Sequence, residues 1–369
     1  MNTFDRHLLK EWLGMLLLVL CAMVGLSFIQ VLYDDFRMLR EWGAGLNDVV
    51  RYVAITVPSF LTLVLPLSIL VSLLFVLGKL HRANEFTALR AAGVGLARIT
   101  APIWVMGLAM CGLSYWLNTD VVPRSVEESQ QWRDALSFRQ QAKSASRDRV
   151  GAVFSVGFDN PAAKRTWFFN RYSQFTNRAY GVSVSLLDDQ RRETVRILSS
   201  EAYFDVRQGW VFERGRELTF DPATGEQLTS VPFEQRVEPT FREDPKLMLL
   251  IDRKPSALSL PQLQRLVDYF ALGNNDKGTP YAVRYHRLIS DTAGPLIVIA
   301  IAIPFAMAGV RVNPVVGVSK SLGLFVLYYL FMITASALAT KHLLSPQTAA
   351  WLPNGGMILL ALWFFVRMR

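Results

Sequence analysis

The chain has 369 residues, a formal net charge of +9 and only 19% charged residues, against about 25% in an ordinary soluble domain. Six stretches contain no Asp, Glu, Lys or Arg: 12–33, 52–78, 99–119, 292–310, 321–340 and 342–366. A helix needs about 20 predominantly apolar residues to cross a bilayer. The sequence therefore predicts a polytopic α-helical membrane protein with six transmembrane helices. It excludes a wholly soluble enzyme, a secreted disulfide scaffold and a disordered protein.

The six stretches divide the chain into three units. Residues 1–120 contain the first three transmembrane helices, residues 121–285 form an inserted domain, and residues 286–369 contain the last three helices. The short loops on one side of the membrane hold ten basic residues, and those on the other side hold four. This difference predicts that both termini are cytoplasmic and that the inserted domain is periplasmic, in a bacterial inner membrane. The insert has 25 basic and 21 acidic residues over 121–290, so its charge does not indicate a nucleic-acid partner.

The inserted domain has the pattern of an all-β fold. Seven segments rich in Val, Phe, Tyr, Trp and Thr are predicted to be strands: 150–158, 165–172, 179–187, 194–206, 209–214, 216–220 and 227–237. Turn signals separate them, which favours a sandwich or a jellyroll-like domain. A polar helix over 124–143 is predicted to extend the third span. A second helix begins after the sheet with a capping box at Ser259 and Gln262, and Leu263, Leu266, Val267 and Phe270 share one face of it.

Several kinds of chemistry have no sequence signature here. The four histidines are scattered, and no metal-ligand spacing, nucleophile elbow or phosphate-binding glycine loop occurs. No catalytic, cofactor or metal site is therefore predicted. The uncharged spans also contain no acid, whereas ion-coupled transporters usually carry intramembrane ionisable groups. If the protein moves a substrate, we expect a separate partner to supply the energy, using ATP that this chain does not bind.

The loop between the second and third spans predicts a short cytoplasmic helix at about 82–93. Asn84 is placed to cap it, and Glu85 lies in its first turn, where the helix dipole favours an acid. Phe86 and Leu89 fall on one face, and Gly93 ends the helix. An ATPase can bind such a helix and transmit its own motion to the membrane helices through it. The alternative is a plain connector whose charges follow the positive-inside rule.

This loop resembles the LptF/LptG (YjgP/YjgQ) family of lipopolysaccharide export permeases. The matching residues are Gly78-Lys79-Leu80, Glu85 and Arg90-Ala91-Ala92-Gly93. The resemblance extends to the layout of three spans, a β domain and three spans, and to the approach to the fourth span at Tyr281–Arg287. It implies one permease subunit of an ABC transporter that extracts lipopolysaccharide from the inner membrane and passes it to a periplasmic bridge toward the outer membrane.

The resemblance also implies partners and a docking site. The partners would be an LptB-type ATPase dimer, a second LptF/LptG-type permease, and the LptC and LptA proteins of the periplasmic bridge. The short cytoplasmic helix would be the coupling helix that seats on the ATPase. Its docking residues would be Glu85, Phe86, Leu89, Arg90, Ala91 and Gly93.

The outer end of the first span is similar to the LptG version of the family, through Leu39-Arg40 and Gly43-Ala44-Gly45, although Glu41 stands where that pattern has a second lysine. The resemblance implies basic side chains for the lipid phosphates and apolar side chains of the first and fifth spans around the acyl chains. The expected lipopolysaccharide-binding residues are Arg37, Arg40, Arg51, Phe28, Leu32, Phe325 and Tyr328. The alternative for the arginines is anchoring at the lipid headgroups, and for the apolar residues it is helix packing.

Two other functions remain open at this stage. One is the permease of another lipid or lipoprotein ABC exporter, although those place the soluble domain after the first span rather than the third. The other is a membrane-anchored periplasmic binding or sensory protein with no transport role. A sensor accounts for the insert but leaves six spans and a short amphipathic cytoplasmic helix unexplained.

Overall fold

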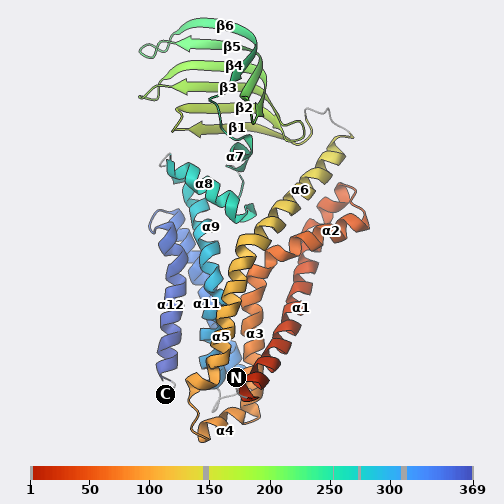
Figure 1. Ribbon diagram of the computed structural model, residues 1–369, viewed down its shortest axis with the longest axis vertical. Coiled ribbons are helices and arrows are strands. Elements are labelled where there is room, and N and C mark those ends of the chain that lie inside the picture. Colours follow the sequence, from red (N-terminus) through yellow and green to blue (C-terminus); the bar gives the residue numbers. More distant parts are fainter. Residues whose placement is uncertain (1–2, 144–148, 252, 273–275, 309–313, 368–369) are drawn as a thin grey trace.

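The computed structural model describes residues 3–143, 149–251, 253–272, 276–308 and 314–367. Long helices form a bundle at one end of the molecule, and a β-sheet lies at the other (Figure 1). Residues 309–313 and 368–369, which belong to the third predicted unit, lie outside the described residues.

The helices before the sheet are α1 (Thr3–Glu41), α2 (Leu46–Thr56), η1 (Val57–Phe60), α3 (Leu61–Arg82), α4 (Glu85–Ala91), α5 (Leu96–Trp116), η2 (Leu117–Val121) and α6 (Val122–Gln141). Those after it are α7 (Pro245–Leu250), η3 (Pro255–Ala257), α8 (Leu260–Leu272), η4 (Asp276–Gly278), α9 (Thr279–Ser290), η5 (Asp291–Ala293), α10 (Gly294–Ala308), α11 (Pro314–Thr340) and α12 (Pro346–Arg367). As predicted, α6 continues the third span as a polar helix.

Membrane-spanning helices precede and follow the inserted domain along the chain, as the sequence predicts. Within the described residues, five helical segments are long and apolar enough to cross a membrane: Thr3–Glu41, Leu46–Arg82, Leu96–Gln141, Thr279–Pro304 and Leu322–Thr340. They correspond to the first five uncharged stretches. The sixth stretch forms α12, which packs against α9, α10 and α11 and runs alongside them (Figure 1).

The helix pair α3 and α10 forms the centre of the bundle. The apolar windows of the second and fourth spanning segments are each 61% buried within the protein, against 17% in α1 and 28% in α11. One large apolar cluster joins α1, α3, α5 and α10, with Leu70, Leu73, Leu77 and Ile303 fully buried in it. Much of the apolar surface of α1 and α11 therefore faces outward, where lipid or another apolar protein surface can cover it.

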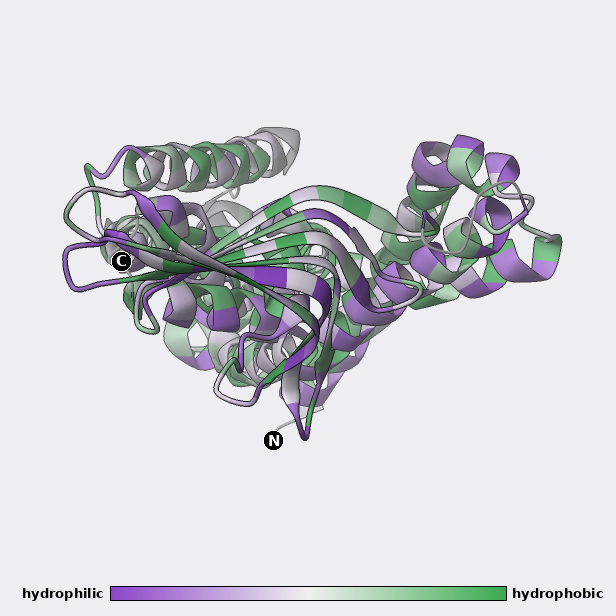
Figure 2. Ribbon diagram, turned by 90° about the horizontal axis from the view of Figure 1, so that it is seen from above, coloured by the Kyte–Doolittle hydropathy of each residue, from purple (hydrophilic) through white to green (hydrophobic). Residues whose placement is uncertain are grey.

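The inserted domain contains one six-stranded antiparallel sheet. Its strands are β1 (Ala152–Asn160), β2 (Arg165–Ser173), β3 (Arg178–Leu187), β4 (Glu193–Asp205), β5 (Gly209–Phe220) and β6 (Gln227–Glu238). Each strand pairs with its neighbours in chain order, so the sheet is a meander. Figure 2 shows hydrophobic and hydrophilic residues in bands along these strands.

A line of unpaired positions crosses the sheet. In every strand one residue is skipped by the register with each neighbouring strand: Ser155, Asn170, Gly181, Ser200, Arg214 and Glu234. Ser155, Gly181 and Arg214 have φ angles of 56°, 62° and 51°, in the left-handed region that non-glycine residues rarely adopt. Backbone in this conformation interrupts the alternation of side chains, so the line is where the sheet bends.

Within one strand, the alternate residues that are buried shift by one position from one side of this line to the other. The sheet therefore folds over its own core. Ile197 and Ala202 of β4 are both fully buried, although residues five apart in a regular strand point to opposite faces. Trp167 of β2 lies with its ring centroid 4.7 Å from that of Trp210 of β5. Two strands three positions apart would be about 14 Å apart in a flat sheet. The curl brings them together around one aromatic core.

Two predictions about the inserted domain were wrong. The segments 209–214 and 216–220 are one strand, β5, because Gly215 continues the strand where its missing side chain leaves room for the Leu198 carbonyl and the Phe233 ring. The strands also form one curled meander, so the sandwich alternative with two packed sheets is wrong, whereas the jellyroll-like alternative stays a prediction. The prediction of an all-β insert is confirmed in its central sheet.

The segment after β6 closes the open side of the sheet. Phe241, which precedes α7, and Met248 of α7 complete the aromatic core. A buried ion pair joins Arg165 Nε to Glu243 Oε1 at 2.7 Å. The predicted capping box of α8 is confirmed: Ser259 N–H donates to Gln262 Oε1 at 3.0 Å and Gln262 N–H donates to Ser259 Oγ at 3.4 Å. Burial raises the pKa of Tyr269 in α8 to about 12, so this phenol stays protonated and donates to the Asp159 carbonyl of β1.

We predict that Gly215→Ala destabilises the sheet by about 2 kcal/mol, because a methyl group there collides with the Leu198 backbone and the Phe233 ring. Thermal unfolding followed by the fluorescence of the buried Trp167 and Trp210 measures this loss. The matched control is Gly157→Ala in β1, where an added methyl group meets nothing within 4 Å. Equal melting temperatures for the two variants would contradict the proposed packing at Gly215.

Candidate functional site

The predicted coupling helix is present as α4, at the end of the molecule opposite the sheet (Figure 1). Asn84 occupies the position before the helix with φ 61°, but its side chain makes no capping hydrogen bond, contrary to the prediction. At the other end, Gly93 has φ 82°. Val94 N–H donates to Leu89 O at 3.0 Å, and Gly93 N–H donates to Arg90 O at 3.0 Å. This is a Schellman motif, so the backbone requires Gly93 for ending the helix.

The predicted docking residues lie on two different faces of α4. Phe86 is only 3% exposed and belongs to the main apolar cluster of the bundle, and Leu89 packs partly against it. Arg90, Ala91 and Gly93 are exposed, and Glu85 is partly exposed. Phe86 therefore anchors α4 to the bundle and is not available on the surface. The exposed face that remains has one acidic and one basic side chain.

Two ion pairs tie the segments on either side of α4 to the base of α1. Arg98, in the first turn of α5, donates to both carboxylate oxygens of Asp5 at 3.1 and 3.0 Å. Lys79 Nζ, near the end of α3, lies 2.6 Å from Glu11 Oε2. Asp5 is 5% exposed, so its charge depends on the bidentate arginine. The base of α1 and the α4 loop are therefore connected both electrostatically and, through Phe86, by packing.

The predicted phosphate-binding arginines lie at the sheet end of α1 and in α2. Arg37, Arg40 and Arg51 are all exposed. Tyr52 donates to Asp35 Oδ2 at 2.7 Å and stacks on Trp132 of α6 at 5.0 Å, so α1, α2 and α6 are held together there. The three predicted arginines lie outside this packed contact and face outward, where they can contact lipid phosphates or headgroups.

The predicted apolar residues separate into two groups. Phe28 of α1 is 41% exposed and Leu32 is partly buried against α2 and α6. Phe325 and Tyr328 of α11 are 8% and 4% exposed and line a cavity within the bundle. The structure therefore brings two of the seven predicted lipid-binding residues together in one site.

This cavity has a volume of about 300 Å³ and lies among α3, α9, α10 and α11. Its lining residues are Ser59, Phe60, Thr62, Leu63, Pro66, Val122, Arg284, Arg287, Leu288, Asp291, Gly294, Val298, Phe325, Tyr328, Tyr329 and Met332. Three of these are charged, and the majority are apolar or aromatic. The cavity is thus amphiphilic, with its charge supplied by α9 and η5.

The charged groups of the cavity have unused hydrogen-bonding capacity. Arg284 Nε and Arg287 Nε are buried and have no hydrogen-bond partner among the described residues. Both guanidinium groups interact electrostatically with the Asp291 carboxylate, which leaves one positive charge in excess. Buried donors without partners are costly, and an anionic ligand group would satisfy them.

A polar shell fixes the helices around the cavity. Tyr328 OH donates to Asn354 Oδ1 at 2.6 Å, and Asn354 Nδ2 donates to the Ser290 carbonyl at 3.0 Å. On the opposite side, Asn118 of η2 donates to the Leu288 carbonyl at 3.3 Å. These bonds join α11, α12 and η2 to the C-terminal end of α9, so the arginine-bearing helix is held from two sides.

The sequence analysis missed Arg284, Arg287 and Asp291. The predicted fourth span begins at residue 292, directly after Asp291, and no span was expected to contain an acid, but the apolar helical segment runs over Thr279–Pro304 and includes all three. Their spacing of i, i+3 and i+7 was the available signal, because these positions share one helix face. That face points into the cavity.

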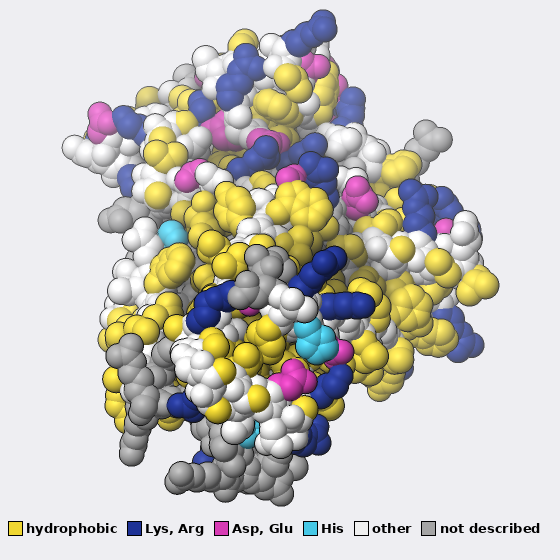
Figure 3. All heavy atoms as spheres, turned by 60° about the horizontal axis from the view of Figure 1, so that its bottom comes forward, with side chains coloured by type: hydrophobic (Ala, Val, Ile, Leu, Met, Phe, Trp, Pro, Cys, Tyr) yellow, Lys and Arg dark blue, Asp and Glu magenta, His cyan; other side chains and the backbone are white. Residues whose placement is uncertain are grey.

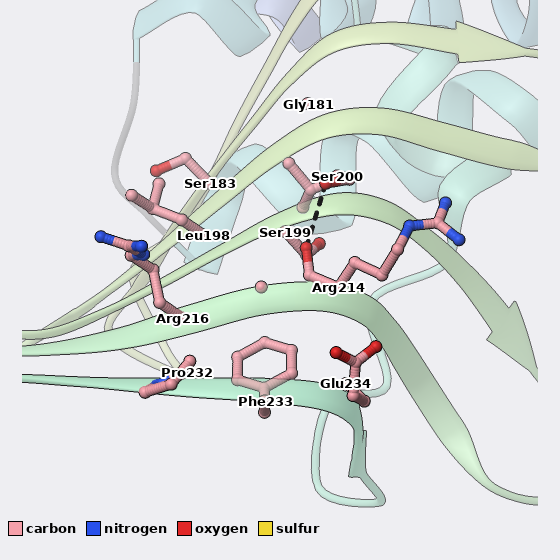
Figure 4. A pocket seen from close by; sticks show the side chains of 12 residues that line it. Gly181, Ser183, Leu198, Ser199, Ser200, Arg214, Arg216, Pro232, Phe233 and Glu234 are labelled. Carbon is pink, nitrogen blue, oxygen red and sulfur yellow. Dashed lines mark hydrogen bonds between the residues drawn. The ribbon is translucent and has the colours of Figure 1, made fainter.

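A second hollow, of about 800 Å³, lies on the sheet along the bend (Figure 4). It crosses β3 to β6 and is lined by Gly181, Val182, Ser183, Leu198, Ser199, Ser200, Arg214, Gly215, Arg216, Pro232, Phe233 and Glu234. Ser200 Oγ donates to the Arg214 carbonyl at 3.0 Å and steadies the bend there. The hollow is open, with a mixed polar and apolar lining. Among the described residues, no group of three or more His, Cys, Asp or Glu side chains could hold a metal ion.

Comparison with known proteins agrees with this architecture. A family model described as lipopolysaccharide export system permease LptF/LptG matches residues 6–367. The lipopolysaccharide export system permease protein LptG of Haemophilus influenzae is 29% identical over 109 residues, which is 30% of this chain and 30% of that protein. The LptF proteins of Escherichia coli and Shigella flexneri are each 28% identical over 103 residues, 28% of either chain.

The matched segments thus span less than a third of the length of these curated relatives. LptG and LptF match at nearly equal identity, so the greater likeness to LptG remains a prediction. The family model, in contrast, covers nearly the whole chain, including both sets of membrane helices and the sheet between them. This chain therefore belongs to the LptF/LptG family of lipopolysaccharide export system permeases.

Proposed function

We propose that this chain is one permease subunit of an ABC transporter that extracts lipopolysaccharide from the inner membrane and passes it toward the outer membrane. The observation that carries the proposal is the amphiphilic cavity among α3, α9, α10 and α11. Arg284 and Arg287 match the phosphate groups of a glycolipid, since a guanidinium group can grip a phosphate with two hydrogen bonds. Phe325, Tyr328 and Met332 match the start of its acyl chains.

The size of the cavity supports a second permease. About 300 Å³ is at the lower limit of a small-molecule site, so it holds only a fragment of a lipopolysaccharide. The rest of the lipid must lie outside this chain. The outward-facing apolar surfaces of α1 and α11 are suited to close a larger chamber with a second LptF/LptG-type subunit. In this arrangement Phe28, Leu32, Arg37, Arg40 and Arg51 would face the same chamber.

We assign the energy source to an LptB-type ATPase dimer that docks on α4. The exposed Glu85 and Arg90 are suited to charge-assisted contacts, with Ala91 and the Gly93 turn allowing close approach. Phe86, Asp5 and Arg98 would transmit the motion of α4 into the bundle. Under this proposal ATP hydrolysis belongs to the partner, this chain binds no cofactor, and both termini and α4 are cytoplasmic.

The sheet would then be periplasmic, and its edge strand β6 supports a contact with the bridge. All twelve residues Gln227–Glu238 form β6, which among the described strands pairs with β5 alone, and nine of the twelve are exposed. The opposite edge, β1, is partly covered by α7 and α8. A free edge can pair with a strand from another domain, as we propose for LptC, with LptA further along the bridge.

We predict that Arg287→Gln lowers the amount of lipopolysaccharide that remains bound to the purified transporter by about tenfold, the value of one lost charge-assisted hydrogen bond. Native mass spectrometry of the complex measures bound lipid and subunit composition together. Arg124→Gln, which removes an exposed arginine of α6, is the matched control. Unchanged lipopolysaccharide in the Arg287→Gln complex would contradict the proposed site. A chain isolated without ATPase or glycolipid would contradict the transporter itself.

Glu85→Ala is expected to reduce the ATPase bound per permease at least tenfold, since it leaves a basic group of the partner without its acid. Co-purification followed by subunit quantification gives the ratio. Glu128→Ala, at an exposed acid of α6, controls for the loss of one negative charge. Full ATPase occupancy in Glu85→Ala would show that α4 is only a connector.

A photo-crosslinking amino acid placed at Val231 of β6 is expected to capture a periplasmic partner in cells. The same amino acid at Val206, in the turn before β5, is the control, because Val206 is more exposed (80% against 57%) but lies off the edge. Equal or greater crosslinking from position 206 would argue against strand addition at β6.

A further inference from the structure

A groove at the α4 end of the bundle lies between α1 and α3, apart from the cavity described above. It has a volume of about 420 Å³ and takes its walls from residues 10–18 of α1 and 75–82 of α3. The view from this end shows Lys and Arg side chains among hydrophobic ones (Figure 3). At 1.5 Å per residue, the groove follows the two helices for about 10 Å.

The floor of the groove is apolar and hollow. Gly14 lines it, and a methyl group added at Gly14 would meet nothing within 4 Å. Leu18 and Phe75 lie deeper along the helices and are 62% and 57% exposed. Because Gly14 has no side chain beside the exposed Leu18 and Phe75, a channel remains there that a hydrocarbon chain can fill.

The end of the groove next to α4 is positively charged. Lys10, Lys79 and Arg82 line it together with one acid, Glu11. Glu11 is already paired with Lys79 at 2.6 Å. Within the part of the chain that the structure describes, neither Lys10 nor Arg82 forms an ion pair. The groove therefore carries three cations against one anion.

We propose that this groove binds one anionic phospholipid of the leaflet at the α4 end, which is the cytoplasmic leaflet if the proposed orientation is correct. Its phosphate lies between Lys10 and Arg82, and an acyl chain follows Gly14, Leu18 and Phe75. Basic pockets between helices on the cytoplasmic side are suited to anionic headgroups. The bound lipid lies beside Lys79, in the last turn of α3 before the α4 loop.

This lipid site is separate from the proposed lipopolysaccharide cavity. The groove is built from the α4 ends of α1 and α3, whereas the cavity arginines belong to α9 at the sheet end of the bundle. None of the groove residues lines the cavity. The two sites can therefore be tested independently in the same preparation.

The test uses the purified transporter in phosphatidylcholine nanodiscs, titrated with cardiolipin and analysed by native mass spectrometry. We expect one tightly retained cardiolipin in the wild type. Lys10→Gln with Arg82→Gln should weaken its binding about twenty-fivefold, at roughly fivefold for each cation near an anionic headgroup. Gly14→Phe should remove it by filling the channel. Binding of lipopolysaccharide should not change in either variant.

Gly112→Phe is the matched control, because Gly112 of α5 also has open space around its Cβ position and lies outside the groove. The proposal is overturned if phosphatidylcholine is retained as tightly as cardiolipin, or if the Gly14→Phe and Gly112→Phe variants bind cardiolipin equally. Crosslinking of a partner's helix to position 14 in the intact complex would overturn it as well. Loss of lipopolysaccharide in Arg287→Gln alone would leave it standing.

Discussion

A buried charge has to be paired, and the Asp5–Arg98 contact at the α4 end of the bundle is where this constraint shapes the molecule most. Asp5 is nearly inaccessible, and the bidentate guanidinium of the half-exposed Arg98 holds its carboxylate. Removing the arginine takes the bidentate partner away from this buried carboxylate and destabilises the base of α1. The pair joins the first turn of α1 to the first turn of α5. It thereby fixes where the α4 loop, which immediately precedes α5, can lie.

The same constraint is met differently at the other end of the bundle. Arg284 and Arg287 share a single nearby acid, Asp291, and keep buried Nε–H groups without partners in the described structure. The Asp5–Arg98 pair therefore has its charges matched, whereas the cavity has an excess positive charge and open donors. A satisfied pair stabilises a fold, and an unsatisfied one in a cavity favours an anionic ligand. This contrast is why the cavity supports the proposed binding role and the Asp5–Arg98 pair supports a mechanical one.

The sequence was sufficient for features that depend on local pattern. Uncharged stretches placed the spans, alternating β-formers placed the strands, and Ser259 with Gln262 marked the start of α8. It failed where the outcome depends on distant residues. Whether Phe86 faces a partner or the core is decided by α1 and α3, which no periodicity in a seven-residue helix reveals. In the sequence, Gly215 indicates a turn between two strands. In the structure it continues one strand, because the Leu198 carbonyl and the Phe233 ring occupy the space of a side chain there. The cavity arginines were missed because each span was predicted as an uncharged stretch, and such a stretch by definition excludes charged residues.

Side-chain hydrogen bonds connect the segment that leaves the sheet to the helical bundle. Ser259 donates to Glu127 of α6 at 2.7 Å, Arg253 donates to Gln130 at 3.1 Å, and Gln130 also donates to the Ala257 carbonyl. The segment that leaves the sheet is therefore bound to α6, which is itself continuous with the third span. Further along the chain lies α9, the helix that carries the cavity arginines. Asn118 of η2, which continues into α6, donates to the Leu288 carbonyl of α9, so the helix that is bound to the segment leaving the sheet is also bound to the helix of the cavity.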